Sequence, residues 1–160
     1  MKRLYILLTA LLVTVTAFAQ SGKELYQKYS DLPEVSAIYI SPAMFRIIGR
    51  LPSIELEAED IDLVPIIKSM TGFYLLSCEG NVGEKLYKEV SKLVSRGTYE
   101  LLLEAKENGE ATRIYSAGSA NEVTSLILLT RDTDDEVTYI GIDGRMDREK
   151  LENILAEAAN

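Results

Sequence analysis

Alternating apolar and polar residues are the clearest feature of the chain, and between residues 98 and 144 they predict four β-strands in succession. The first two strands flank Asn108-Gly109, a dipeptide that favours a type I′ turn because both positions need a positive φ angle. A two-residue turn of this kind fixes the register of the hairpin. The expected cross-strand pairs are Glu107 with Glu110, Ala105 with Thr112, Glu104 with Arg113, Leu103 with Ile114, Leu102 with Tyr115 and Leu101 with Ser116.

The third strand of this block is nearly continuous in apolar residues. It runs from Glu122 to Thr130, a pattern typical of a strand that is covered on both faces, so we place it near the centre of the sheet. An acidic turn at residues 132–135 leads into the fourth strand, from Val137 to Ile142. Because the links between successive strands are short, the four strands are expected to form an antiparallel meander.

Helical periodicity dominates the rest of the chain. The best helix covers Val82–Arg96, where apolar residues fall on one stripe and Gly97 can end the helix in the left-handed conformation. Ser41-Pro42 can start a short helix, whose apolar side would carry Met44, Ile47 and Ile48. The remaining predicted helices are Gly22–Ser30, Asp62–Met70 and a last one capped by Asp147 with Met146 packed on Leu151, and the remaining strands are Val35–Ser41 and Phe73–Cys78.

These elements predict an α+β fold with one mixed, largely antiparallel β-sheet that ends in the four-strand meander and has helices packed on at least one face. The segment Leu51–Asp60 is expected to be an exposed edge or an extended loop. With 47% hydrophobic and 26% charged residues, the chain can bury a core as a single domain over residues 20–160.

Residues 1–19 have the pattern of a secretory signal peptide. Lys2 and Arg3 precede an apolar run over residues 4–15, and Ala17-Phe18-Ala19 resembles a cleavage site before Gln20. The apolar run is shorter than the roughly 20 residues of a spanning helix, so no stable membrane span is expected after cleavage. A lipoprotein would need Cys in place of Gln20. The sequence therefore predicts export, to the periplasm or the extracellular space, of a soluble protein that is not a lipoprotein.

The net charge limits the classes of binding partner, and the cysteine content limits disulfide formation. The formal net charge is −8, and it becomes more negative when Lys2 and Arg3 are removed with the signal peptide. Such a surface argues against nucleic acid and anionic lipid as partners, because Lys and Arg hold both. Cys78 is the only cysteine, so no disulfide can form within the chain, and we expect a buried, unreactive thiol.

The sequence contains no histidine, which excludes Ser-His-Asp and Cys-His catalysis and ordinary zinc sites. Nucleotide-binding and nucleophile-elbow motifs are also missing from it. We therefore expect no enzyme activity, cofactor or metal. Asp132, Asp134, Glu136 and Asp143 loosely match a calcium loop, but Val137 stands where that loop needs Gly, so a solvated acidic turn is expected.

Two other functions remain open. A small-ligand groove could be lined by tyrosines of the predicted strands, with Tyr39, Tyr74, Tyr115 and Tyr139 as the best contributors. A carboxylate-dependent hydrolase could draw its acid and nucleophile from a run of acidic residues, which comprises Glu55, Glu57, Glu59, Asp60 and Asp62.

A protein-binding surface is the leading hypothesis. The meander carries apolar residues on both faces, and if helices cover only one, the other is an exposed patch of the kind that marks an interaction surface. The candidate interaction face consists of Leu102, Tyr115, Leu126 and Leu128. It predicts a protein partner or a homo-oligomer formed through the sheet face.

Several blocks of the sequence resemble a bacterial family of exported proteins catalogued as domain of unknown function 4252. The blocks are VSAIYISPAMFRII at residues 35–48, FYLLSCEG at 73–80, VSRGTYELLLEAKENGE at 94–110 and YIGIDGRMDREKLENIL at 139–155. The resemblance covers nearly all of the chain after the signal peptide. It implies a cell-envelope protein of Gram-negative bacteria with a link to envelope stress or regulatory signalling, and it implies no catalytic residue.

Overall fold

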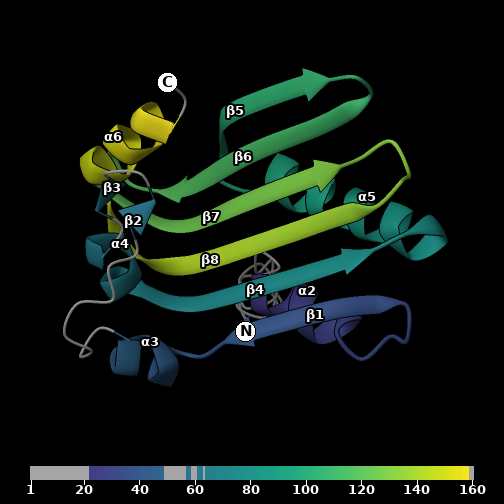
Figure 1. Ribbon diagram of the computed structural model, residues 1–160, viewed down its shortest axis with the longest axis horizontal. Helices are drawn as coiled ribbons and strands as arrows, with labels where there is room; N and C mark the ends of the chain where they lie inside the picture. Colours follow the sequence, from purple (N-terminus) through teal and green to yellow (C-terminus); the bar gives the residue numbers. More distant parts are fainter. Residues whose placement is uncertain (1–21, 49–56, 59–60, 63, 159–160) are drawn as a thin grey trace, which may run out of the picture.

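The computed structural model describes residues 22–48, 57–58, 61–62 and 64–158 (Figure 1). The predicted signal peptide and most of the segment Leu51–Asp60 lie outside these residues. The elements in chain order are α2 (Gly22–Tyr29), β1 (Val35–Ile40), α3 (Pro42–Ile48), β2 (Glu57–Ala58), β3 (Ile61–Asp62), α4 (Val64–Ser69), β4 (Met70–Cys78), α5 (Gly80–Arg96), β5 (Glu100–Glu107), β6 (Glu110–Gly118), β7 (Glu122–Arg131), β8 (Val137–Asp147) and α6 (Arg148–Ala158).

Six strands form one sheet in the order β1-β4-β8-β7-β6-β5, and every neighbouring pair is antiparallel. The α+β class and the four-strand meander β5–β8 are confirmed. The strand with the near-continuous apolar pattern, β7, lies at the centre of the sheet beside β8, as predicted. Strands β2 and β3 form a separate small hairpin.

The β5–β6 turn is the expected one, because Asn108 and Gly109 have φ angles of 50° and 92°. The predicted pairs hold from Glu107 back to Leu103, which lies opposite Ile114. Beyond that point the prediction is wrong: Leu101 lies opposite Tyr115 and not Ser116, since Leu102 is the extra residue of a β-bulge. One added residue shifts every later pair by one, which the turn alone does not reveal.

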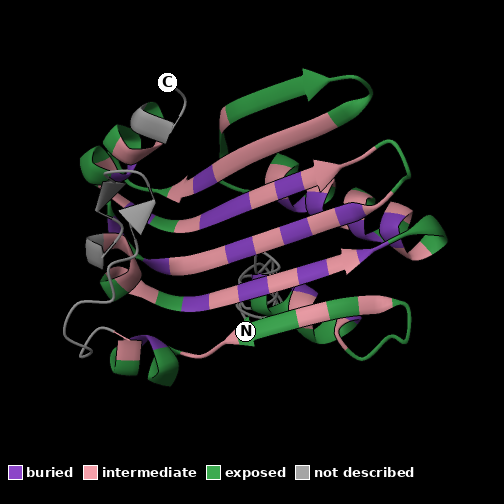
Figure 2. Ribbon diagram, viewed as in Figure 1, coloured by how far each residue is buried: buried purple, intermediate pink, exposed green. Residues whose placement is uncertain are grey.

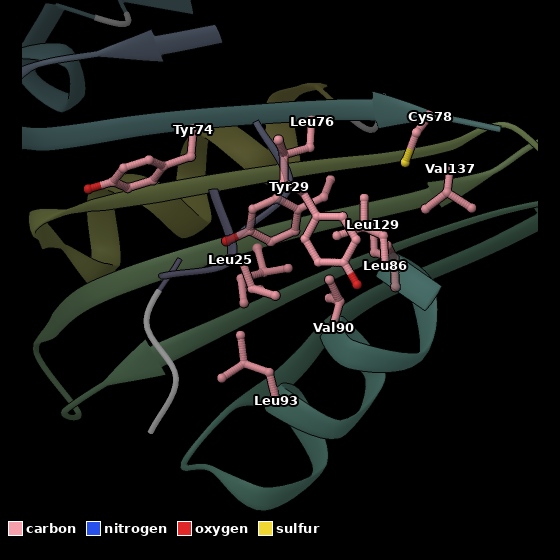
Figure 3. Packing of buried hydrophobic residues seen from close by; sticks show 12 residues of the cluster. Leu25, Tyr29, Tyr74, Leu76, Cys78, Leu86, Val90, Leu93, Leu129 and Val137 are labelled. Atoms are coloured by element: carbon pink, nitrogen blue, oxygen red, sulfur yellow. The ribbon is translucent and has the colours of Figure 1, made fainter. Parts of the chain in front are cut away.

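Helices α2 and α5 cover one face of the sheet, and both lie behind it in Figure 1. Their apolar stripes, with Leu25 and Tyr29 on α2 and Leu86, Val90 and Leu93 on α5, are buried as predicted. Figure 3 shows these side chains pointing at those of β4, β7 and β8. The strand residues of this main core are Tyr74, Leu76, Cys78, Ile127, Leu129, Val137 and Tyr139.

A second apolar cluster lies at one end of the opposite face, where α4 and α6 pack (left in Figure 1). Its buried members are Val123, Leu126, Met146 and Leu151. Met146 and Leu151 therefore pack together as the sequence predicts, and Asp147 caps α6, its Oδ1 accepting a hydrogen bond from the Lys150 amide at 3.0 Å. We call α4 and α6 the end helices.

Two local predictions are wrong. In α3 the buried residue is Phe45, whereas Met44 and Ile47 are exposed, because the side of this two-turn helix that meets β4 and α4 carries Phe45. Gly97 has a φ angle of −95° and does not adopt the left-handed conformation. The chain leaves α5 already extended, since β5 begins only three residues later.

Candidate interaction surface

The face of the sheet that lies opposite α2 and α5 carries an uninterrupted line of aliphatic side chains, one from each strand. Strand register produces this line, because each residue pairs with the next across the sheet and alternate residues share a face. In spatial order the members are Ile38, Leu75, Ile140, Leu128, Ile114 and Leu103. We call this line the aliphatic row and the face that carries it the open face.

A second line runs parallel to the aliphatic row, two residues further along each strand and away from the end helices. It consists of Ser36, Ser77, Thr138, Thr130, Thr112 and Ala105, and we call it the hydroxyl row. On the other side of the aliphatic row, Ile40, Phe73 and Ile142 continue the apolar surface towards the end helices. Neither row contains a charged residue.

Exposure separates the two faces of the sheet. On the covered face, Leu76 and Tyr139 are 0% exposed and Leu129 is 1% exposed. On the open face, the four inner members of the aliphatic row are half-buried (Figure 2). At the two edge strands both faces are exposed: Ile38 is 51% and Leu103 39% exposed on the open face, and Tyr39 is 44% and Leu101 50% exposed on the covered face. A partial exposure that persists to the centre of the sheet means that the described elements leave this row uncovered.

The four residues of the predicted interaction face do not form one surface in the structure. Leu128 belongs to the aliphatic row. Leu126 and Leu102 lie on the same face but pack into the cluster under the end helices, where Leu126 is 9% exposed. Tyr115 does not belong with them: it pairs with Ile127 and packs against the main core. The bulge at Leu102 explains the difference, because the predicted pairing placed Leu102 and Tyr115 on one face.

Sequence reasoning missed the other five members of the aliphatic row. Each is an alternate apolar residue in a recognised strand, so the signal was present. Aligning them requires the strand order, in which β1 and β4 flank the meander through β8.

The strand tyrosines lie on the covered face and not around a groove. The rings of Tyr39 and Tyr74 stack with centroids 5.4 Å apart, and Tyr26 of α2 packs against both. Tyr139 is completely buried, and its hydroxyl has no hydrogen-bond partner among the described residues. Tyr74 and Tyr139 fill the core, whereas Tyr39 remains 44% exposed on the edge strand β1.

Asp143 is the carboxyl with the most unusual environment on the covered face. Burial raises its pKa, and hydrogen bonds from Ser125 and Tyr74 oppose that shift. Burial together with the charge of Asp143 raises the pKa of Tyr74 to about 12. Burial raises the pKa of Tyr139 beyond the range of ordinary tyrosines. Burial therefore favours the protonated forms of Tyr74, Tyr139 and Asp143.

A hollow of about 620 Å³ opens where β1, β4 and β8 meet the start of α5. Its lining includes three carboxylates, Glu34, Glu79 and Glu136, and no tyrosine. The Glu136 carboxylate accepts a hydrogen bond from the Ser77 hydroxyl of the hydroxyl row. Asp143, the carboxyl whose pKa burial raises, is not part of this hollow.

The remaining acidic candidates do not gather into a metal site. Asp132 Oδ1 accepts hydrogen bonds from the amides of Asp134 and Glu136, both at 2.9 Å, so it closes its own turn. Asp143 lies far along β8, and no metal-binding group of three ligands occurs among the described residues. Glu55, Glu59 and Asp60 lie outside the described residues, and Glu57 and Asp62 pair through the backbone of the small hairpin.

Cys78 is buried as expected, and burial and the charge of Glu136 raise the pKa of its thiol. Raised thiol pKa values oppose formation of the nucleophilic thiolate. Among the described residues, no helix combines the length and the apolar character that crossing a membrane requires.

Comparison with known proteins gives one match. Residues 29–154 match the family described as Domain of unknown function (DUF4252). No curated protein and no solved structure matches the chain.

Proposed function

We propose the following function for this protein, which belongs to the family DUF4252. The protein is an exported component of the cell envelope that binds another protein through the open face of its sheet, without catalysing a reaction. Export rests on the signal-peptide pattern of residues 1–19. Cell fractionation followed by N-terminal sequencing tests it, with a mature chain beginning at Gln20 as the expected result and an uncleaved cytoplasmic chain as the contrary one.

The observation that carries the proposal is the aliphatic row, which crosses all six strands and is partly exposed throughout; Ile114 also packs against the cluster under the end helices. Strands lie about 4.8 Å apart and alternate residues about 7 Å apart, so the open face measures on the order of 500 Å². Exposed apolar patches of more than a few hundred Å² mark interaction sites. Its exposure, together with the lack of histidine in the sequence, supports binding over catalysis.

The size of the open face also sets the expected strength of binding. Because the hydroxyl row is polar, about 300 Å² of this area is apolar, and its burial yields about 8 kcal/mol before costs, at about 25 cal/mol per Å². Association costs about 4–15 kcal/mol in lost translational and rotational freedom. A weak or moderate complex is therefore expected, unless polar contacts around the face add to it.

Site-specific photo-crosslinking in the native host tests the proposal. A benzophenone amino acid is placed at Ile38, which is exposed on the open face, and in a matched strain at Lys92, which is exposed on α5. We expect protein adducts of defined mass from position 38 only. The proposal is wrong if position 38 gives no adducts, or if both positions give the same ones.

A further inference from the structure

Five glutamates stand in a line at one end of the open face, each at the terminus of a strand. Glu34 precedes β1, Glu79 follows β4 and Glu136 precedes β8. Glu107 and Glu110 end β5 and begin β6, directly opposite each other. We call this line the acidic edge; it lies beyond the hydroxyl row, at the right of the sheet in Figure 1, at the end opposite α4 and α6.

Contacts and register place the acidic edge on the same side of the sheet as the aliphatic row. The hollow at that end is lined by Glu34, Glu79 and Glu136, by Ser36 and Ser77 of the hydroxyl row, and by Cys78 and the start of α5, so it spans the end of the sheet. The three glutamates each lie two residues from a member of the hydroxyl row, which assigns them to the open face. At the β5–β6 hairpin, Glu107 and Glu110 are two residues beyond Ala105 and Thr112, so strand alternation puts them on the open face.

The glutamates of the acidic edge have no basic partners among the described residues, whereas seven acids elsewhere form ion pairs and others, such as Asp31, Asp134 and Glu149, do not. Glu84 pairs with Lys88 and Arg131, and Glu104 pairs with Lys106 and Arg113. Glu89, Glu100, Glu122, Asp135 and Glu152 also form ion pairs. Like charges directly opposite each other, such as Glu107 and Glu110, destabilise a sheet. The chain thus has basic side chains available for ion pairs but leaves this edge uncompensated.

We propose that the partner of the open face is an amphipathic protein segment, with apolar side chains that pack on the aliphatic row and lysine or arginine side chains that reach the acidic edge. This inference rests on the proposed function, and it adds the chemistry of the partner. Apolar contact supplies most of the affinity, while the charged line fixes the direction in which the segment lies.

Charge also argues against two other possible occupants of the open face. An anionic membrane surface would be repelled by the acidic edge. On a second copy, Arg145 is paired with Glu122, and Arg148 with Glu100 and Glu152, while the exposed Lys85 and Lys92 lie on α5, on the covered side of the sheet. Two copies with parallel strands would also place acidic edge against acidic edge.

Binding of three designed 18-residue peptides to the purified mature protein tests the inference. One carries a leucine face and a lysine face, the second has glutamate in place of lysine, and the third has serine in place of leucine. Fluorescence anisotropy should give the tightest binding for the leucine/lysine peptide, at least tenfold weaker binding for the other two, and weakening of the first by added salt.

Two protein variants locate the site. Glu107→Gln with Glu110→Gln should weaken binding of the leucine/lysine peptide about three- to tenfold. Glu149→Gln with Glu152→Gln removes the same charge from α6, at the opposite end of the sheet, and should leave binding unchanged. Leu128→Thr with Ile140→Thr keeps good strand formers and should weaken every peptide that binds.

The outcomes distinguish the two proposals. If the lysine and glutamate peptides bind equally and both lose affinity in the Leu128→Thr/Ile140→Thr variant, the basic partner is wrong and the open face still binds protein. If neither peptide binds, or the threonine variant changes nothing, both proposals fail. A dimer of the protein alone, seen by sedimentation at tens of micromolar and lost in the threonine variant, would replace the basic segment with a second copy.

Discussion

The two faces of the sheet are built from the same strands and similar residues, yet they differ in cover and in charge. β7 shows this most directly: Ile127 and Leu129 are 1% exposed beneath α2 and α5, whereas Leu128, between them, remains half-buried on the open face. Glu84 and Glu104, on the side of the covered face, are ion-paired, whereas the five glutamates at the end of the open face have no basic partner among the described residues. Apolar character alone does not create a core; an element must also be available to cover it.

The largest expected contrast compares neighbouring leucines of β4. Leu76→Ala removes a fully buried side chain from the main core and should lower the free energy of unfolding by about 2–5 kcal/mol. Leu75→Ala changes the open face one residue away, and its cost should be near 1 kcal/mol because water already reaches that side chain. Urea denaturation measures both. Equal losses would mean that the open face is packed as tightly as the covered one.

The second prediction concerns the density of the covered face at Gly141. A Cβ atom there would lie 2.3 Å from the Tyr139 hydroxyl oxygen and 2.9 Å from its ring. Gly141→Ala should therefore cost about 1–3 kcal/mol of stability through overpacking. Adding Tyr139→Phe removes the nearest atom and should recover part of the loss in the same denaturation assay. A neutral Gly141→Ala variant would contradict this packing.

Tyr139→Phe alone is expected to act in the opposite direction. The hydroxyl is buried without a hydrogen-bond partner among the described residues, so its removal should stabilise the protein by about 1 kcal/mol. Tyr74→Phe is the matched control, because that hydroxyl donates to Asp143 and its loss should destabilise. Thermal unfolding of the two variants compares them; a destabilised Tyr139→Phe protein would indicate that the hydroxyl has a partner.

The smallest expected effect is a pH dependence at Asp143. Because burial raises its pKa in the folded state, the folded protein favours the protonated carboxyl, and stability falls as pH rises through that pKa. Asp143→Asn should therefore be more stable than the wild type at pH 8. We expect a gain below about 1 kcal/mol, because the carboxyl is only partly buried and water screens its charge.

The gain from Asp143→Asn should shrink as pH falls towards the ordinary aspartate value of about 3.9. Unfolding curves at several pH values measure the trend. A gain that does not change with pH would assign the effect to packing and not to charge.

Local patterns of the sequence predicted the strands, the helices and the Asn108-Gly109 turn, because turn chemistry and periodicity act over a few residues. The register failed where one extra residue, Leu102, enters β5, and with it the placement of Tyr115. The bulge depends on packing under the end helices, where Leu102 contacts the cluster around Leu126. The residues next to Leu102 in the sequence do not indicate that contact, so the bulge could not be predicted from them.

The aliphatic row and the acidic edge could not be predicted for a related reason. Glu34, Glu79, Glu107, Glu110 and Glu136 each stand just outside, or at the end of, a predicted strand, which is a visible signal. They come from segments up to a hundred residues apart, and only the order of the strands brings them to one end. The sequence therefore indicated apolar residues on both faces of the meander, but not how they align across the six strands.

The β-bulge has a consequence for the direction from which a partner can arrive. β5 borders the sheet, is exposed along almost its whole length (Figure 2), and would otherwise offer free backbone groups to a strand from another molecule. An irregular and highly charged border discourages such sideways growth. Addition of a strand from another molecule is thereby hindered at β5, whereas β1, the other border of the sheet, is regular and carries no charged residue.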